Sequence, residues 1–511
     1  MIRIAILSDP HMHDVGFGGE GPVVRSLADT IHSTRVYNES AAALRQVLAD
    51  IAAERPDLVI IAGDLTDDGQ QANWAAMAEV LAGYRREHGT RIFATPGNHD
   101  QWAGAGKPLT KDRIEEDGRV TELAGAPAPG AVLMPSMRMV GYADEIRHAR
   151  AFGYMREATD LCWETPFGAS DRLEDRSPDG IPDLSYLVEP IAGLWLMSVD
   201  ANVYLAGGEG HVDCSKDGWN ATLAHKPYLL PWMTDVASRA RRLGKRLVAF
   251  SHYPVADIFS DTTAALETVE GARTGRRQMP DEDAIRALAD TGIGLHFSGH
   301  FHVDATAADP SGRLVNIALA STVAFPAGWK LLELDGERTR ITTRPLCSAP
   351  GFNRWEDRYR AEVARKGAVP SPVIGAPDYG RFLDRHFAAM VIDRRLDEDW
   401  PEPMRDLVLN RPLASLPGLA GVEGVTMAEM LIDWYRLREA GGGALAGVPA
   451  GRRALYLRLA ADHALPDDGR DEAGRLLALF FRTLGAHVAA GARGFAALAA
   501  AGIETGDPPP A

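Results

Sequence analysis

The stretch Ile2-Arg-Ile-Ala-Ile-Leu-Ser-Asp-Pro-His11 joins a run of aliphatic residues directly to an aspartate and a histidine. Aliphatic runs of this length, bounded by Gly, Pro or Asp, are typical of buried strands in a layered sheet. The next such run is 58–62, and between the two the sequence predicts a helix over 41–54, with Ser40 as its N-cap and Pro56 as its stop. A strand, a helix and a strand at this spacing indicate a layered α/β domain.

The same pattern continues to about residue 345. Aliphatic or aromatic runs at 91–95, 194–199, 246–250 and 293–297 predict further buried strands. Three later runs, at 303–308, 313–319 and 329–334, are separated by Pro-Ser-Gly and Phe-Pro-Ala-Gly turns. These turns predict that antiparallel strands complete the domain. We therefore expect one α/β domain over 1–345.

Two parts of the chain depart from this pattern. Residues 101 to about 190 are rich in Gly, Pro and charge, with one helical stretch near 143–158, and a connection this long predicts a cap-like insert. From about residue 350, segments rich in Ala, Leu, Arg and Glu have helical spacing, so we expect a C-terminal all-α domain over 350–505. The tail 506–511, which contains three consecutive prolines, is expected to be disordered.

The composition narrows the class of partner. The chain has 511 residues, of which 46% are hydrophobic and 24% charged, and its net charge of −16 argues against nucleic acid as the main partner. Its three cysteines lie far apart without CxxC spacing, which favours a reducing compartment. We expect no signal peptide. The most apolar long stretch, 476–502, contains Arg482, His487 and Arg493, so we expect no transmembrane segment and a cytoplasmic protein.

Polar residues follow five of the predicted strands, at the point where each strand ends. In α/β sheets, ligands bind outside the carboxyl ends of the strands. Two divalent ions about 3.5–4 Å apart need a bridging carboxylate, and neutral imidazoles and carbonyl oxygens fill their remaining positions. The five strand ends supply these residue types: Asp9-Pro-His11, Gly63-Asp64, Gly97-Asn98-His99-Asp100, Ser251-His252 and Gly299-His300-Phe301-His302. Each element alone has a structural explanation, such as a turn after a strand, but five in order favour a site.

In this order the elements resemble the DxH, GD, GNH[D/E], H and GHxH motifs of the calcineurin-like metallophosphoesterase family, over residues 1–302. The resemblance implies a fold of the α/β class (α+β four-layer type), a β-sandwich flanked by helices. It also implies a dinuclear centre of two divalent metal ions. Manganese or iron is favoured and zinc is the alternative, because every implied ligand is N or O. The implied ligands are Asp9, His11 and His302 for one metal, Asn98, His252 and His300 for the other, and Asp64 as the bridge.

The same resemblance implies the catalytic groups. His99 would be the leaving-group acid or the residue that stabilises the transition state. A carboxylate three residues after the bridging aspartate would orient this histidine, and here that residue is Asp67. The expected reaction is hydrolysis of a phosphoric ester by attack of a metal-bridging hydroxide.

Within the family, Gly63-Asp-Leu-Thr-Asp-Asp-Gly69 and the GNHD form look most similar to the bacterial class III cyclic-nucleotide phosphodiesterase branch with a capping insert. A phosphodiester substrate is therefore favoured, such as a cyclic nucleotide or another small diester. The arginines that the Ser/Thr protein phosphatase branch places within GDxxDRG and after GNHE are missing. That departure argues against a protein phosphatase.

Other functions stay open at this point. A phosphomonoesterase, a nuclease or a lipid-pyrophosphate hydrolase of the same superfamily would share the motifs. A nuclease would want a basic groove, whereas the Ala/Leu-rich segment 476–501 could give a lipid enzyme its apolar surface. A non-catalytic metal-binding interaction protein would show a lost ligand, and no ligand of the motif is lost. A homo-oligomer formed through the C-terminal helices is also left open.

Overall fold

The computed structural model describes residues 1–168, 180–207, 210–259, 262, 265, 278–367, 371–416, 419–444, 447–463 and 471–506. The tail expected to be disordered lies outside these residues, except for Gly506. No helix within the described residues combines the length and the apolar character needed to cross a membrane.

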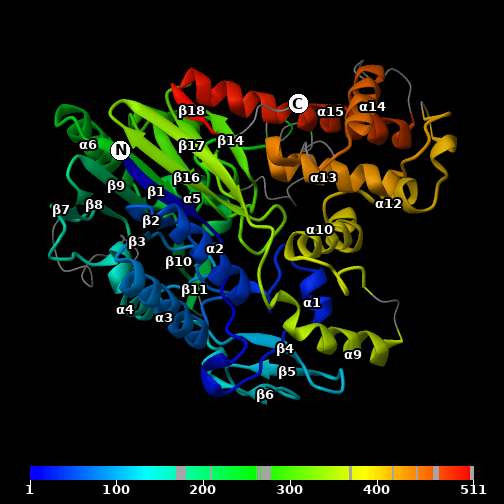
Figure 1. Ribbon diagram of the computed structural model, residues 1–511, viewed down its shortest axis with the longest axis horizontal. Coiled ribbons are helices and arrows are strands. Elements are labelled where there is room, and N and C mark those ends of the chain that lie inside the picture. Colours follow the sequence, from blue (N-terminus) through cyan, green and yellow to red (C-terminus); the bar gives the residue numbers. More distant parts are fainter. Residues whose placement is uncertain are drawn as a thin grey trace.

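Two mixed β-sheets form the centre of the molecule (Figure 1). Strands β1, β2 and β3 are parallel to one another, and so are β9, β12, β13 and β15. The six-stranded sheet has the order β18 (Ile503–Thr505), β17 (Arg338–Pro345), β16 (Gly328–Asp335), β1 (Ile2–Leu7), β2 (Leu58–Ile61) and β3 (Arg91–Ala94). The seven-stranded sheet has the order β14 (Ala305–Ala308), β15 (Val315–Ala318), β13 (Leu295–Ser298), β12 (Arg246–Ser251), β9 (Leu194–Val199), β8 (Tyr186–Ile191) and β7 (Cys162–Glu164).

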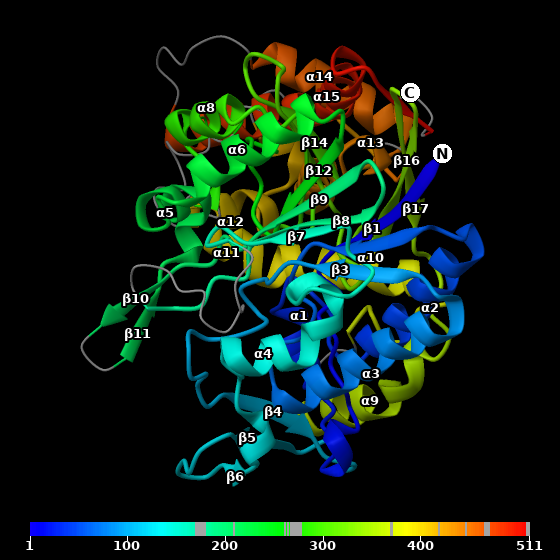
Figure 2. The ribbon, with the colours of Figure 1, turned by 90° about the vertical axis from the view of Figure 1, so that its left-hand side faces the viewer.

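Helices cover the outer face of each sheet, so the domain has four layers (Figure 2). Successive side chains of β12 point to opposite faces of the sheet, and both faces are buried. Val248 and Phe250 join the core between the sheets, while Ala249 packs with the outer helices. The fold class predicted from the sequence is confirmed. Helices α2 (Ser40–Glu54) and α3 (Gln71–His88) lie on the six-stranded sheet, and α5 (Gly218–His225), α6 (Leu229–Arg242) and α8 (Glu282–Asp290) lie on the seven-stranded one.

The region between β3 and β9 adds two kinds of structure. Its first part forms a small sheet of β4 (Thr110–Ile114), β5 (Val120–Ala124) and β6 (Val132–Leu133), followed by α4 (Tyr142–Ala149). Its last part supplies β7 and β8 to the seven-stranded sheet. A hairpin of β10 (Tyr204–Gly207) and β11 (Gly210–Asp213) projects from the body of the molecule (Figure 2). We refer to residues 101–141, which contain the small sheet, as the insert.

The chain after β17 is almost entirely helical and gathers on one side of the sheets (Figure 1). The later helices share a core around Trp434 and Phe480, whereas Tyr359 and Tyr379, near the start of this region, pack with the core of the sheets. The chain then returns to pair β18 with β17. The helices are α9 (Glu356–Lys366), α10 (Tyr379–Met390), α11 (Leu396–Glu398), α12 (Glu402–Leu409), α13 (Met427–Ala444), α14 (Ala450–Asp462) and α15 (Glu472–Ala500). The division into domains 1–345 and 350–505 stays a prediction.

One predicted helix boundary was wrong. Ser40 is the first residue of α2 and Glu39 holds the N-cap position, without a side-chain cap. The Ser40 hydroxyl is used elsewhere, because Oγ donates to Tyr37 O (2.7 Å) and accepts from the backbone N–H of His13 (2.9 Å). It therefore ties the helix to the loop after β1.

Glu39 itself is buried against the C-terminal region. Its Oε1 accepts a hydrogen bond from the hydroxyl of Tyr359 in α9 (2.9 Å), and its Oε2 has no hydrogen-bond partner among the described residues. Burial raises the pKa of Glu39 to about 7, more than the Tyr359 hydroxyl lowers it. The folded chain therefore keeps this proton over a pH range in which the unfolded chain has released it.

This proton gives a pH-dependent stability that the variant Glu39→Gln removes. A carboxyl whose folded pKa is raised loses stability as the pH rises from its unfolded value of 4.5 to about 7. Relative to the wild type, Glu39→Gln is expected to gain up to about 3 kcal/mol of unfolding free energy between pH 4.5 and pH 8. Urea unfolding at several pH values measures this, with the exposed Glu87→Gln as control. Parallel pH profiles for Glu39→Gln and the wild type would contradict the prediction.

Candidate metal centre

Five loops meet at the carboxyl edge of the two sheets, and two glycines allow their close approach. A Cβ atom at Gly97 would overlap Asp64, and one at Gly299 would overlap Ser8 and Asp9. Glycine is therefore required where the loop after β3 crosses the loop after β2, and where the loop after β13 crosses that after β1. The glycines of the sequence motifs thus serve packing, while the residues beside them carry the functional groups.

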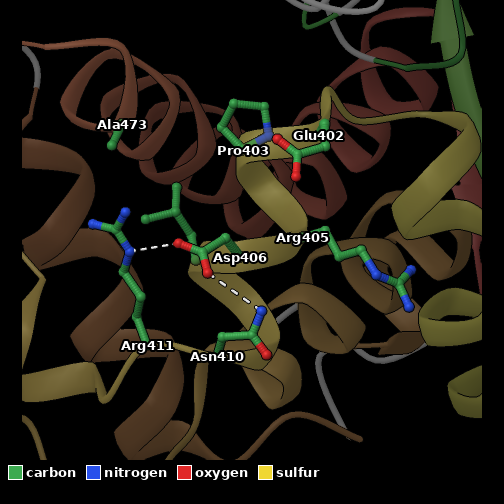
Figure 3. A pocket seen from close by; sticks show the side chains of 8 residues that line it. Glu402, Pro403, Arg405, Asp406, Asn410, Arg411 and Ala473 are labelled. Carbon is green, nitrogen blue, oxygen red and sulfur yellow. Dashed lines mark hydrogen bonds and ion pairs between the residues drawn. The ribbon is translucent and has the colours of Figure 1, made fainter.

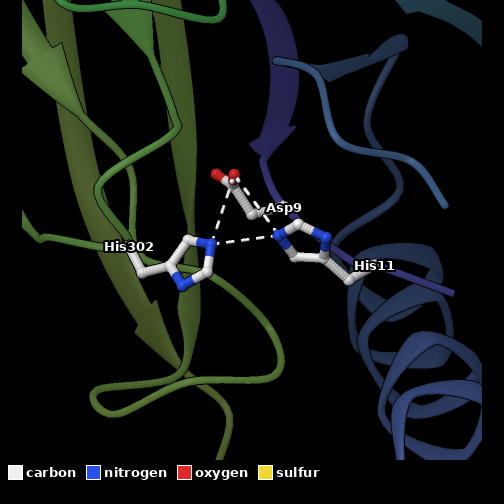
Figure 4. Close-up of side chains that lie close together, drawn as sticks. All are labelled: Asp9, His11 and His302. Carbon is white, nitrogen blue, oxygen red and sulfur yellow. Dashed lines mark hydrogen bonds and ion pairs between the residues drawn. The ribbon is translucent and has the colours of Figure 1, made fainter. Parts of the chain in front are cut away.

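The first cluster consists of Asp9, His11 and His302 (Figure 4). Nε2 of His11 lies 3.0 Å from Nε2 of His302, and each of these nitrogens lies within 3.8 Å of Asp9 Oδ1. All three side chains are buried. The backbone N–H of His300 donates to both carboxylate oxygens of Asp9 (3.1 Å each), which fixes the carboxylate against the loop after β13.

The second cluster consists of Asp64, His252 and His300, with Asn98 beside it. Oδ1 of Asn98 lies 3.0 Å from His252 Nε2 and 2.9 Å from His300 Nδ1. Nδ1 of His252 contacts Ala62 O (3.0 Å), and this contact leaves Nε2 directed at the cluster. An amide oxygen, a carboxylate and two imidazole nitrogens therefore face one another.

Asp64 lies between the two clusters. Its Oδ2 is 3.1 Å from His252 Nε2 in the second cluster and 3.6 Å from His11 Nε2 in the first. Its Oδ1 accepts a hydrogen bond from the backbone N–H of His99 (2.7 Å). The structure thus brings all seven residues expected as ligands into one site, with Asp64 between the two clusters.

The donor set fits a pair of divalent ions. Burial lowers the pKa of His11 and of His300 well below the usual value, so these rings are neutral, as ligands must be. Burial would also lower the pKa of His252, but Asp64 raises it to about 9. A proton is therefore held between His252 and Asp64, and a metal would displace it. Every donor atom is N or O, a set that suits manganese, iron or zinc.

The backbone of the site is strained in a way that regular strands are not. Asp9, His11, Asp64, His300 and His302 all have positive φ, between 41° and 75°. For residues other than glycine this conformation costs on the order of 1 kcal/mol or more each, and it persists only where the surroundings enforce it. Such concentration of strain is typical of functional sites.

His99 lies beside both clusters, but its carboxylate partner differs from the expected one. Nδ1 of His99 contacts Oδ1 of Asp68, and its ring packs edge-on against His11 with centroids 5.2 Å apart. Asp67, the residue expected in this position, instead binds Arg25 (3.1 Å) and Arg35 (2.7 Å). Asp68 has a φ of 56°, and the two neighbouring carboxylates engage different partners.

Three cations near His99 were not found from the sequence. Arg35 lies 3.3 Å from both Asp68 Oδ1 and His99 Nδ1, and Lys111 of β4 forms an ion pair with Asp68. Burial would raise the pKa of Asp68, but Lys111 and then His99 hold it well below its usual range. Arg25, Arg35 and Lys111 stand outside every motif, so only the adjacent acidic pair Asp67-Asp68 in the sequence hinted at buried cationic partners.

Asp100, the last residue of the GNHD element, joins two of the loops. Its Oδ2 accepts from the backbone N–H of Gly97 (2.9 Å), and its Oδ1 accepts from the backbone N–H (3.0 Å) and hydroxyl (3.1 Å) of Thr66. The side chain thus fixes the loop that carries Asn98 and His99 to the loop that carries Asp64.

A separate polar hollow of about 340 Å³ lies in the C-terminal region, beside α12 and the start of α15 (Figure 3). Two of its charged groups bind each other, since Arg411 pairs with Asp406 (2.7 Å), and Asp406 also accepts from Asn410 (3.3 Å). Arg405 forms an ion pair with Asp397. With its arginines paired in this way, the hollow offers no comparable candidate site.

Comparison with known proteins agrees with this geometry. Residues 2–141 match the family model of the calcineurin-like phosphoesterases. The matched part contains the first three motif loops, and the chain combines two mixed sheets flanked by helices with a helical C-terminal region. No curated protein matches the chain.

Two solved structures are similar to the chain at low identity. A dimetal phosphatase from Danio rerio is 13% identical, with 68% of this chain and 96% of that chain covered and a TM-score of 0.41. A phosphopantetheinyl hydrolase from Mycobacterium tuberculosis is 11% identical, with 62% and 89% covered and a TM-score of 0.25. Similarities of this size do not bear on the substrate.

The position of Asp64 gives a direct test of the site. Asp64→Asn keeps the size of the side chain but removes the charge shared by the two clusters. We expect the variant to lose the dinuclear complex and to lose more than about 100-fold in metal affinity, the upper end for an outer-shell partner. Isothermal titration with Mn²⁺ and elemental analysis measure this.

The matched control is Asp14→Asn. In the wild type, the Asp14 carboxylate accepts hydrogen bonds from the backbone N–H groups of Gly16 and Gly18 in the loop after β1. It is expected to bind two ions like the wild type. An Asp64→Asn protein that still holds two ions with wild-type affinity would show that Asp64 is not the bridge.

Proposed function

We propose that the chain is a dinuclear metal-dependent phosphoester hydrolase that acts on phosphodiesters. The observation that carries this proposal is the position of Asp64, whose Oδ2 lies 3.1 Å from one cluster and 3.6 Å from the other. A carboxylate shared by two sets of N and O donors is the arrangement that two-metal hydrolases need. The family match over 2–141 supports the same reaction class.

Asp9, His11 and His302 would hold one ion, Asn98, His252 and His300 the other, with Asp64 between them. When bound, the two ions would neutralise the charge of the phosphate ester and lower the pKa of a water molecule. Manganese or iron is the proposed pair and zinc the alternative, because no cysteine takes part. The loops fixed by Asp100 hold the donors in place before substrate arrives.

His99 is the proposed leaving-group acid. Its side chain is 29% exposed, whereas that of His11, next to it, is 1% exposed. When the ring is protonated, Nδ1–H donates to Asp68, and Nε2–H is then the proton available to the departing oxygen. A positioned acid of this kind typically contributes a factor of about 10²–10⁴ to the rate.

The preference for a diester rests on the resemblance of residues 63–69 and of the GNHD element to the cyclic-nucleotide phosphodiesterase branch. The net charge of −16 supports a small phosphorylated substrate over nucleic acid. We also propose a cytoplasmic location and a homo-oligomer formed through the C-terminal helices.

The proposal predicts the outcome of a simple comparison. With Mn²⁺ added, the wild-type chain is expected to hydrolyse bis-p-nitrophenyl phosphate at least about 10-fold faster, in kcat/KM, than p-nitrophenyl phosphate, a difference of about 1.4 kcal/mol. Release of p-nitrophenolate is followed by absorbance, and Asp64→Asn, prepared in parallel, detects contaminating hydrolases. A preference for the monoester would replace the phosphodiesterase by a phosphomonoesterase, and activity on neither would contradict the proposal.

A further inference from the structure

One side chain of the insert, that of Lys111, contacts the carboxylate partner of His99. Lys111 stands on β4, which is paired with β5 and is fixed to the N-terminal loops by the hydrogen bond from the Ile114 N–H to Val24 O (2.8 Å). Its ammonium group binds Oδ2 of Asp68, while Oδ1 of the same carboxylate contacts His99. A strand of the insert is thus connected to His99 by two consecutive contacts.

Lys111 differs from the two arginines beside it. Arg25 and Arg35 are both held by Asp67, and Arg25 also binds Asp29 (3.1 Å). In the part of the chain that the structure describes, Asp68 is the ion-pair partner of Lys111. The side chains of Lys111 and Asp68 are 16% and 14% exposed, so the pair is largely shielded from solvent. Shielded pairs with charge-assisted hydrogen bonds orient their members more strongly than exposed pairs do.

Without Lys111, we expect the Asp68 carboxylate to turn toward Arg35. Arg35 lies 3.3 Å from Oδ1, the oxygen that contacts His99, and it already donates to Asp67 at 2.7 Å. Lys111 opposes this pull because it binds the other oxygen, Oδ2. The carboxylate is therefore held between two cations, with Oδ1 presented to Nδ1 of His99.

We propose that Lys111 is a positioning residue of the insert, which holds Asp68 so that His99 directs Nε2 at the leaving group. This inference rests on the proposed role of His99. It assigns the insert a part in the chemistry of the leaving group, in addition to any part in covering the site. The competing explanations are that Lys111 attaches the insert to the body of the protein, or that it binds the substrate phosphate itself.

The three explanations differ in kinetics. A positioning residue acts on proton transfer, so its loss lowers kcat for a poor leaving group and spares a good one, with KM unchanged. A substrate-binding lysine would raise KM for both substrates. A lysine that only attaches the insert would lower the stability and affect both substrates equally.

The experiment compares Lys111→Met with the wild type on two diesters that differ in the leaving group, methyl p-nitrophenyl phosphate and methyl phenyl phosphate. We expect kcat for methyl phenyl phosphate to fall about 10- to 100-fold, as for a misplaced catalytic group, and kcat for methyl p-nitrophenyl phosphate to fall less than about 3-fold. Lys111→Arg keeps the charge and is expected to recover most of the loss. His99→Ala should show the same selectivity for the leaving group.

The matched control is Arg113→Met, two residues further along β4. In the wild type, Arg113 binds Glu115 (2.6 Å) on its own segment. The variant Arg113→Met is therefore expected to leave both rates unchanged. An equal fall on both substrates, a raised KM with unchanged kcat, or a Lys111→Arg variant as impaired as Lys111→Met would each overturn the inference.

The inference and the proposed function fail in different ways. If His99→Ala shows selectivity for the leaving group and Lys111→Met does not, the proposed function stands and the inference is overturned. If the wild-type protein hydrolyses neither diester, the proposed function is contradicted. In that case, crystal structures of the wild type and of Lys111→Met test the positioning role of Lys111 on its own. A rotated or displaced His99 ring in the variant supports this role, and an unchanged ring overturns it.

Discussion

The buried charge of Asp64 is the constraint to which the rest of the site responds. A carboxylate buried without partners would be protonated, because burial raises its pKa. Here His252, His99 and His11 act against burial and hold the pKa of Asp64 well below its usual range. These three partners come from three different loops. Gly97 lets the loop of His99 approach Asp64 closely, and Gly299 lets the loop after β13 approach Asp9. The sandwich of two sheets brings those loops to one edge.

The sequence predicted the strands that end at the candidate site and the residues that gather in the two clusters, but not the strands of the insert, the hairpin β10–β11 or β17 and β18. Strands β1 and β9 begin and end at the predicted residues, because both are mainly apolar runs with at least four consecutive buried residues. Cluster residues follow strand ends directly, so chain order alone brings them to one edge. The partner of His99 could not be predicted in this way. Asp67 and Asp68 are adjacent, and only the backbone geometry between them decides which one meets the histidine.

Contacts between residues far apart in the sequence could not be predicted either, and the C-terminal helices supply several of them. The Glu362 carboxylate accepts from the backbone N–H of Leu27 (2.7 Å), and the His386 ring contacts Thr30 O (2.7 Å), so α9 and α10 hold helix α1 (Leu27–Ile31), which precedes the loop that carries Arg35. On the other side, the Asp304 N–H donates to Glu439 O of α13 (2.9 Å), just after His302. The helical region therefore supports loops on both sides of the clusters.

The two clusters and the surroundings of His99 are held by different parts of the chain. The rings of His11, His252 and His302 are buried and that of His300 is half-buried, and they are held by loops of the sandwich that the C-terminal helices support. His99 is more exposed, and its carboxylate partner is bound by a residue of the insert. A change in the insert can therefore alter how His99 is presented while every donor atom of the two clusters keeps its position. Different segments of the chain thus hold the residues of the two clusters and the carboxylate partner of His99.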